Sequence, residues 1–226
     1  MIRRVSPLKK ALGSLIVVGS MSFLTVAGTF AIMSSDTANR QSSIASGTLT
    51  FSNTVGAGTA CFSYNGPLNA NPSCDALFSA STLMYPGTLA TAKVTIANNG
   101  SLNPSSLYVY MPSCSMQTTP GAPPGGANPC GLNGAQFYLQ ETNSSWTPLA
   151  SCLYPPSANT SCTAVASTLY GFSTTYTSSA APLNLGSGPT IGNKRYFIVG
   201  MQLPSNASNS LQGEEALFSL TWGFAQ

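Results

Sequence analysis

The last stretch of the chain has an apolar face that repeats every second residue. The opposite parity is small or polar from Ser219 onward. Because successive side chains of a β-strand point to opposite faces, the stretch is predicted to be a C-terminal strand with one buried face. The apolar face holds Ala216, Phe218, Leu220, Trp222 and Phe224, and the other face holds Ser219, Thr221 and Gly223.

Further runs with a period of two predict more strands. Tyr196–Leu203 is apolar on both faces, which is typical of a central strand of a sandwich. Leu107–Met111 places Tyr108 and Tyr110 on the face opposite its apolar residues. The remaining runs are Thr48–Phe51, Lys93–Ala97 and a shorter one around Phe137 and Leu139.

Long irregular segments separate these runs, chiefly Pro112–Asn133 and Ala150–Ser161. No helical periodicity appears after Met33, and about 195 residues follow the N-terminal leader, a length that one β-sandwich accommodates. The pattern predicts an all-β fold, an antiparallel β-sandwich over residues 45–226.

The N-terminal residues have the layout of a secretory signal peptide. Two arginines and two lysines within the first ten residues precede an uncharged apolar run over Ala11–Met33. We expect a signal-peptide helix over residues 1–31, cleaved between Ala31 and Ile32 because Thr29 and Ala31 are small. Cleavage after Ala27 and an uncleaved membrane anchor are open alternatives. With cleavage, the chain is secreted and meets the membrane only during export.

The composition excludes much catalytic chemistry. The chain contains no histidine and only five acidic residues, so histidine-based triads and zinc sites cannot form. Cleavage after Ala31 leaves four cationic residues against these five acids, a net charge of −1 that does not attract nucleic acid. We expect no enzyme activity, no cofactor and no metal site. The acids are Asp36, Asp75, Glu141, and Glu214 with Glu215 in a solvated turn.

The cysteines predict disulfides. All six follow the leader, in a segment that meets an oxidising compartment, and their number is even. Several connectivities are compatible with six cysteines. Pairing in sequence order is favoured because each bridge then closes one proline- or glycine-rich loop. The pairs are Cys61 with Cys74, Cys114 with Cys130, and Cys152 with Cys162.

Three stretches occur in an order that carries a family resemblance. The first joins Gly28–Ala31 to Ala45–Leu49. The second runs from Tyr85-Pro86-Gly87-Thr88 through Val94-Thr95-Ile96 to Asn98-Asn99-Gly100-Ser101-Leu102. The third is Leu211-Gln212-Gly213 followed by the strand from Phe218 to Gln226. Together they resemble the cleavage region, internal turns and chain end of the TasA/camelysin family of secreted biofilm-matrix fibre subunits.

The resemblance implies a jelly-roll sandwich, a dedicated signal peptidase and fibres built from copies of the chain, with an accessory matrix protein as a further partner. Such fibres form when an N-terminal donor segment completes the sheet of the next subunit. The donor would be residues 32–44, although its few apolar anchors and lack of clean alternation also fit a flexible N-terminus. Its candidate residues are Ile32, Met33, Ser34, Ser35, Asp36, Thr37, Ala38, Asn39, Arg40 and Ile44.

Surface features leave an alternative function open, a monomeric cell-surface adhesion or carbohydrate-binding module. Tyrosines could line a sugar-binding face, although packing within the sandwich also explains them. These tyrosines are Tyr108, Tyr110, Tyr170, Tyr176 and Tyr196. Patterns for N-glycosylation fall in or beside predicted turns, at Asn99, Asn143, Asn159 and Asn206.

Overall fold

The computed structural model describes residues 46–66, 70–78, 84–119, 125–149, 151–157, 162, 167–211 and 213–226. The chain divides into two compact units, Met1–Ser46 and Gly47–Gln226, and the sheets and the core belong to the second unit. The expected signal peptide, its cleavage site at Ala31 and Ile32, and the expected donor segment lie outside the described residues.

The larger sheet of the second unit is antiparallel, with the strand order β2-β1-β3-β9-β6-β7. β9 lies between β3 and β6, so the prediction of a central strand is confirmed. The strands are β1 (Phe51–Val55), β2 (Cys61–Phe62), β3 (Leu89–Asn98), β6 (Gln136–Thr142), β7 (Ser167–Thr168) and β9 (Lys194–Gln202).

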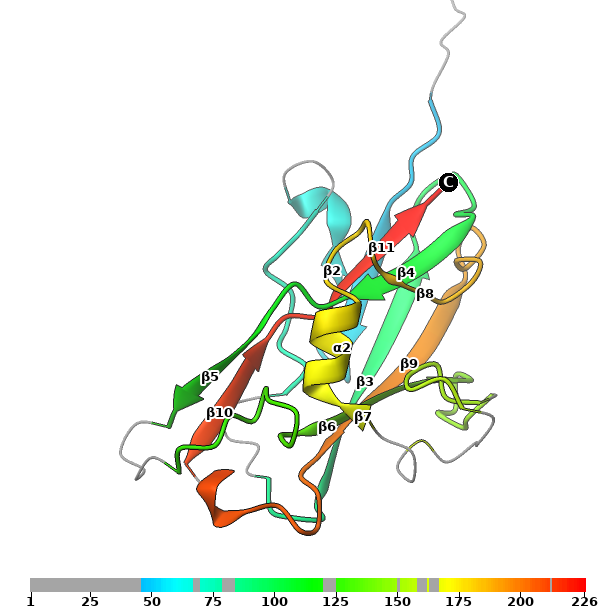
Figure 1. Ribbon diagram of the computed structural model, residues 1–226. Coiled ribbons are helices and arrows are strands. Elements are labelled where there is room, and N and C mark those ends of the chain that lie inside the picture. The colour runs from blue at the N-terminus through cyan, green and yellow to red at the C-terminus, as the bar shows by residue number, and fades with distance from the viewer. Residues whose placement is uncertain are drawn as a thin grey trace, which may run out of the picture. The chain divides into compact units, whose positions relative to one another are not determined.

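A smaller sheet with the order β11-β4-β8 packs against the first (Figure 1). β4 leads into β5, and β10 leads into β11, so the same two chain segments continue as the two-stranded ribbon β10-β5. These strands are β4 (Ser106–Tyr110), β5 (Cys114–Thr118), β8 (Leu183–Asn184), β10 (Glu214–Phe218) and β11 (Thr221–Ala225).

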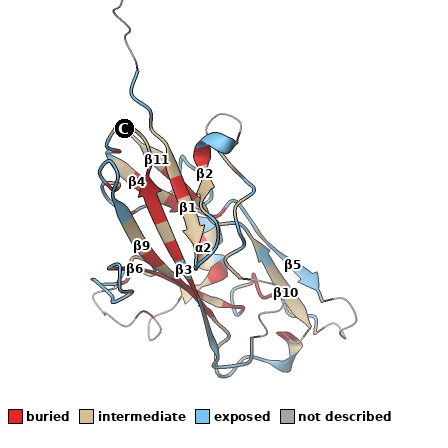
Figure 2. Cartoon of the chain, turned by 180° about the vertical axis from the view of Figure 1, so that it is seen from behind, coloured by how far each residue is buried: buried red, intermediate tan, exposed pale blue. Residues whose placement is uncertain are grey.

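Side chains of one parity from each sheet form a common core. Figure 2 shows buried residues along β3, β4 and β9, whereas the β5–β10 ribbon is mostly half-buried or exposed. The predicted apolar face of the C-terminal stretch is confirmed, because Trp222 is buried and the other four side chains pack against the core. The fully buried side chains of the core include Val94, Ile96, Leu107, Val109, Phe137, Leu139, Phe197 and Val199.

Several predicted boundaries are wrong. The C-terminal stretch is two strands, since β11 pairs with β4 and β10 pairs with β5, and Pro112 between β4 and β5 cannot donate to a ladder. β5 itself lies inside Pro112–Asn133, where we expected irregular chain, because β10 supplies its hydrogen-bond partner.

At two places the error concerns a local turn. The first strand begins at Phe51 and not at Thr48, because the Thr48 carbonyl accepts from Ser101 and Leu102 in a turn. Glu214 and Glu215 open β10 instead of forming a solvated turn.

One short helix, α2 (Leu169–Thr175), was missed by the sequence analysis. Thr168 caps its N-terminus by accepting a hydrogen bond from the Gly171 amide at 3.1 Å. Leu169 and Phe172 are three residues apart, so both point from one face of the helix into the core. Seven residues carry too few apolar repeats for a helical period to be recognised. The 3-10 turns Ser63–Asn65 and Asn209–Leu211 also lie in the described residues.

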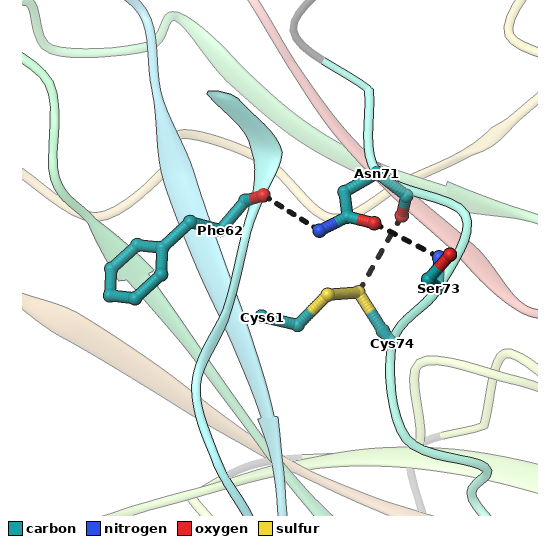
Figure 3. Close-up of a disulfide and its surroundings, with 5 residues drawn as sticks. All are labelled: Cys61, Phe62, Asn71, Ser73 and Cys74. Carbon is teal, nitrogen blue, oxygen red and sulfur yellow. Dashed lines mark hydrogen bonds between the residues drawn. A yellow bond between two sulfur atoms is a disulfide. The ribbon is translucent and has the colours of Figure 1, made fainter. Parts of the chain in front are cut away.

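The six cysteines pair in sequence order, which confirms the expected connectivity. In the first bridge, the Asn71 side chain donates to the Phe62 carbonyl at 3.1 Å and accepts from the Ser73 amide at 3.0 Å (Figure 3). Asn71 thereby holds the strand with Cys61 against the segment with Cys74. Three disulfides indicate an oxidising, extracellular environment.

Candidate functional site

The outer side of β11 has backbone groups without partners among the described residues. Leu107 of β4 turns its peptide groups toward β8, since its amide donates to Gly186 and its carbonyl accepts from Leu185, both at 2.8 Å. The N–H and C=O groups of its neighbour Tyr108 therefore point toward β11, where Tyr108 pairs with Gly223. By the same alternation, the N–H and C=O groups of Trp222 and Phe224 point away from β4.

The row of unpaired, outward-pointing peptide groups continues from β11 along β10. The Thr119 amide donates to the Gly213 carbonyl at 2.7 Å, so residues of odd number in β10 face β5. The peptide groups of Ala216 and Phe218 then point outward, as those of Trp222 and Phe224 do in β11. We call the outer side of residues 214–225 the acceptor edge.

Other edges of the described sheets are short or closed. β2, β7 and β8 have two residues each, which is a common way to prevent strand addition. On the outer side of β1, the Phe51 amide donates to the Ser63 hydroxyl at 3.2 Å, and the Val55 carbonyl accepts from Gly58.

β11 has none of the features that usually protect an edge. Its sequence, Thr-Trp-Gly-Phe-Ala, contains no charge and no proline. β5 also has an open outer side, but upstream of it the edge is occupied, because Met111 donates to the Tyr176 carbonyl and β4 pairs with β8. From Ala216 to Ala225 the acceptor edge has no charge and no proline, so this is the longest unprotected edge in the described part of the chain, and Glu214 and Glu215 lie at its β10 end.

The acceptor edge borders the junction between the two sheets. The rings of Phe51 in β1 and Phe224 in β11 lie 4.7 Å apart. Thr48, before β1, bonds to Ser101, and Ala225, at the end of β11, accepts from the Ser105 hydroxyl, so β1 begins where β11 ends (Figure 1). The strands run in opposite directions along what we call the β1–β11 seam.

A cluster of charged residues lies elsewhere, at the start of β9. Arg195 binds both carboxylate oxygens of Glu141 at 2.6 Å and donates to the carbonyls of Leu185 and Ser187 at 2.9 and 2.8 Å. Because Glu141 and Arg195 belong to the larger sheet and the two carbonyls follow β8, the cluster ties the two sheets together. Its members are mutually satisfied.

An open, polar hollow of about 520 Å³ adjoins this cluster, between residues 141–149 and 192–196. On the outer face nearby, Lys93 lies 5.0 Å from the Trp146 ring, and Trp146 meets Tyr196 edge-on at 5.6 Å. Tyr196 is the aromatic residue among those that line the hollow, and its ring is in contact with Trp146.

The structure does not gather the five candidate tyrosines on one face. Tyr108 and Tyr110 stack at 6.4 Å on the outer face of β4. Tyr196 lies on the larger sheet, and Tyr176 packs against Tyr154 and Phe172. Tyr170 is exposed on α2. The five tyrosines therefore lie on different elements of the described residues and do not form one aromatic face.

Burial raises the pKa of three tyrosines. For Tyr108 the neighbouring Tyr110 raises the pKa further. For Tyr154, a hydrogen bond with Ser167 lowers the pKa in part. Tyr138 lies over Gly200 and under the Cys152–Cys162 bridge, and its phenol loses hydration there.

Three of the four glycosylation candidates lie in the described residues. Asn99 is exposed, and its amide donates to Thr50. The Asn143 side chain accepts from the amides of Ser145 and Thr147, both at 2.9 Å, and so shapes its own turn. Asn206 is exposed in a turn after β9. Asn159 lies outside the described residues.

The remaining acids do not form a site in the described residues. Glu214 accepts from the Thr118 hydroxyl at 3.1 Å and from the Gly126 amide at 3.0 Å. Within the described ranges, no three His, Cys, Asp or Glu side chains come together to hold a metal ion. The same ranges contain no helix long and apolar enough to cross a membrane.

The sequence analysis missed the acceptor edge and two buried polar atoms beside it, Asn53 Oδ1 and Trp222 Nε1. Alternation could have identified the inward face of β11 but not which of its peptide groups lack a partner. No protein-family model matches the chain, and no curated protein matches it.

Proposed function

We propose that the chain is the structural subunit of an extracellular fibre, in which residues 32–44 of one copy add as a strand to the acceptor edge of the next. The observation that carries the proposal is the outward line of unpaired peptide groups at Trp222 and Phe224. An extended segment satisfies such groups by β-augmentation, and main-chain hydrogen bonds supply much of the affinity.

The lengths of the two partners agree. The acceptor edge spans 12 residues, five in β10, five in β11 and Ser219 and Leu220 between them, or about 40 Å at roughly 3.3 Å per residue. The donor segment of 13 residues covers this length when extended. A strand added there would give the smaller sheet a fourth member facing the six-stranded sheet, in keeping with the proposed jelly-roll sandwich.

Donation from copy to copy produces a filament. Each subunit offers a segment at one end of its sequence and an edge at the other, so contacts are head-to-tail and need not close into a ring. The disulfides and the N-terminal leader support secretion, and the resemblance supports a place in the biofilm matrix or at the cell surface. Copies of the chain are the proposed partners, and we assign no catalytic role to any residue.

Negative-stain electron microscopy of two chains, one starting at Ile32 and one at Ala45, tests the function. Both would be incubated under identical non-reducing conditions. We expect filaments only from the longer chain. If both chains form filaments, residues 32–44 are not the donor segment. If both stay monomeric, the fibre is refuted and a monomeric adhesion module is favoured.

Amide hydrogen exchange then tests the edge. The chain starting at Ala45 retains the whole second unit and its core, and a synthetic peptide of residues 32–44 would be added to it. We expect the amides of Trp222 and Phe224 to become protected. The amides of Thr221 and Gly223, which face β4, serve as matched controls and should not change. Peptide binding without protection at Trp222 and Phe224 would place the donor elsewhere.

A further inference from the structure

Two buried polar atoms of the β1–β11 seam have no hydrogen-bond partner, the acceptor Asn53 Oδ1 and the donor Trp222 Nε1. Trp222 is only 6% exposed. Burial removes such groups from water, so each is unfavourable until a partner replaces the lost hydration. Apolar residues would fill the same positions without this cost, and neither atom serves another contact in the described residues.

The two side chains lie on the core faces of the two strands that form the seam. Asn53 pairs with Ile96, so its side chain shares the core face of β1 with Phe51 two residues away. Trp222 shares the core face of β11 with Phe224, again two residues away. Phe51 contacts Phe224, and the strands run in opposite directions. Asn53 therefore lies two residues along β1 from this contact and Trp222 two residues back along β11, where its ring also packs on Phe197 of β9.

One acceptor and one donor together match a hydroxyl or carboxamide side chain. A serine or threonine hydroxyl accepts from the indole N–H and donates to the amide oxygen, and asparagine or glutamine can do the same with its two ends. A charged side chain would be too costly to bury there, and an aliphatic one would leave both atoms unpaired.

One face of the donor segment carries uncharged polar side chains of this kind. Its even-numbered positions include both charged residues, Asp36 and Arg40, which must stay in water. Its odd-numbered positions are uncharged and polar after Met33. They are Ser35, Thr37, Asn39, Gln41 and Ser43. The segment has few apolar anchors and would bind an apolar groove weakly. Its polar side chains instead match the unpaired acceptor and donor of the seam.

We propose that Asn53 and Trp222 bind a hydroxyl or carboxamide side chain from the odd-numbered face of the incoming donor segment, and thereby fix its register and select it over apolar strands. The site rests on the proposed function, since its occupant is residues 32–44 of a second copy. The two residues are specificity determinants of the acceptor edge, and β11 supplies the main-chain bonds beside them.

Binding of residues 32–44 as a peptide to the chain starting at Ala45, measured by calorimetry, tests the proposal. Five peptide variants change one inward position each, Ser35→Ala, Thr37→Val, Asn39→Ala, Gln41→Ala and Ser43→Ala. We expect one of them to bind about tenfold more weakly, because it leaves two buried polar atoms unpaired. Ser34→Ala, on the opposite face, is the control and should bind like the unchanged peptide.

A variant of the acceptor chain completes a double-mutant cycle with the peptide variants. In the chain carrying Asn53→Leu and Trp222→Phe, the sensitive peptide substitution should cost less than threefold, because the partners of the lost group are gone. Thermal unfolding checks that this variant is folded, and the peptide substitutions remain informative if it is not. If the unchanged peptide binds and none of the five substitutions weakens it, the proposal is wrong. If the unchanged peptide does not bind, the fibre function itself fails.

Discussion

Replacing Arg195 by methionine should test the link between the two sheets. Arg195 makes two bonds of 2.6 Å to Glu141 and two to carbonyls after β8, and its side chain is 15% exposed while that of Glu141 is 23% exposed. Loss of one partner of a fully buried pair costs about 3–5 kcal/mol. Because Glu141 retains some hydration, we expect Arg195→Met to lower the free energy of unfolding by about 2–4 kcal/mol.

Equilibrium unfolding of the chain starting at Ala45, in urea without reductant, would measure this loss. For a unit of this size, it corresponds to a fall in Tm of roughly 5–15 °C. The exposed neighbour Lys194 offers a matched control, and Lys194→Met should change stability by less than about 0.5 kcal/mol.

The double variant Arg195→Met with Glu141→Met should be more stable than Arg195→Met alone, because it removes the unpaired carboxylate. A loss below about 0.5 kcal/mol for Arg195→Met, or a double variant that loses the sum of both single effects, would refute the proposed clamp.

Three other predictions concern stability. Asn98→Ala should cost about 2–3 kcal/mol in chemical unfolding, since the buried side chain bonds to Gly100, Leu102 and Pro189, and a loss near zero would contradict this account. Gly200→Ala should lower Tm more than Gly223→Ala. A Cβ added at Gly200 lies 2.0 Å from the buried Tyr138 ring, whereas a Cβ added at Gly223 lies 2.3 Å from the half-exposed Tyr108 ring, which can move. The reverse order of the two Tm values would contradict this explanation. The three tyrosines with raised pKa contribute stability that is complete below pH about 10 and is lost as the pH rises through their folded pKa. The free energy of unfolding, measured in denaturant at several pH values, should therefore decline on the alkaline side of pH 10. Unchanged stability to pH 12 would exclude the burial of these phenols.

The sequence predicted the features that depend on local order along the chain. Alternation identified the strands around Val94, Val109 and Phe197 and the buried face with Trp222, because a period of two is a property of consecutive residues. The even cysteine count and the loops between the cysteines predicted the disulfide pairs, because each pair closes a short segment. Absence of histidine excluded whole classes of chemistry without any structure.

Features that depend on distant partners required the tertiary structure. β5 was missed because its partner β10 is about a hundred residues away, and the break between β10 and β11 depends on Pro112 in the paired segment. The sequence identified Trp222 as a core residue. Only the tertiary structure brings β1 and β11 together at one seam. It also leaves Asn53 Oδ1, Trp222 Nε1 and the outer side of β11 unpaired, because strand order and register arise from contacts between segments far apart in the chain.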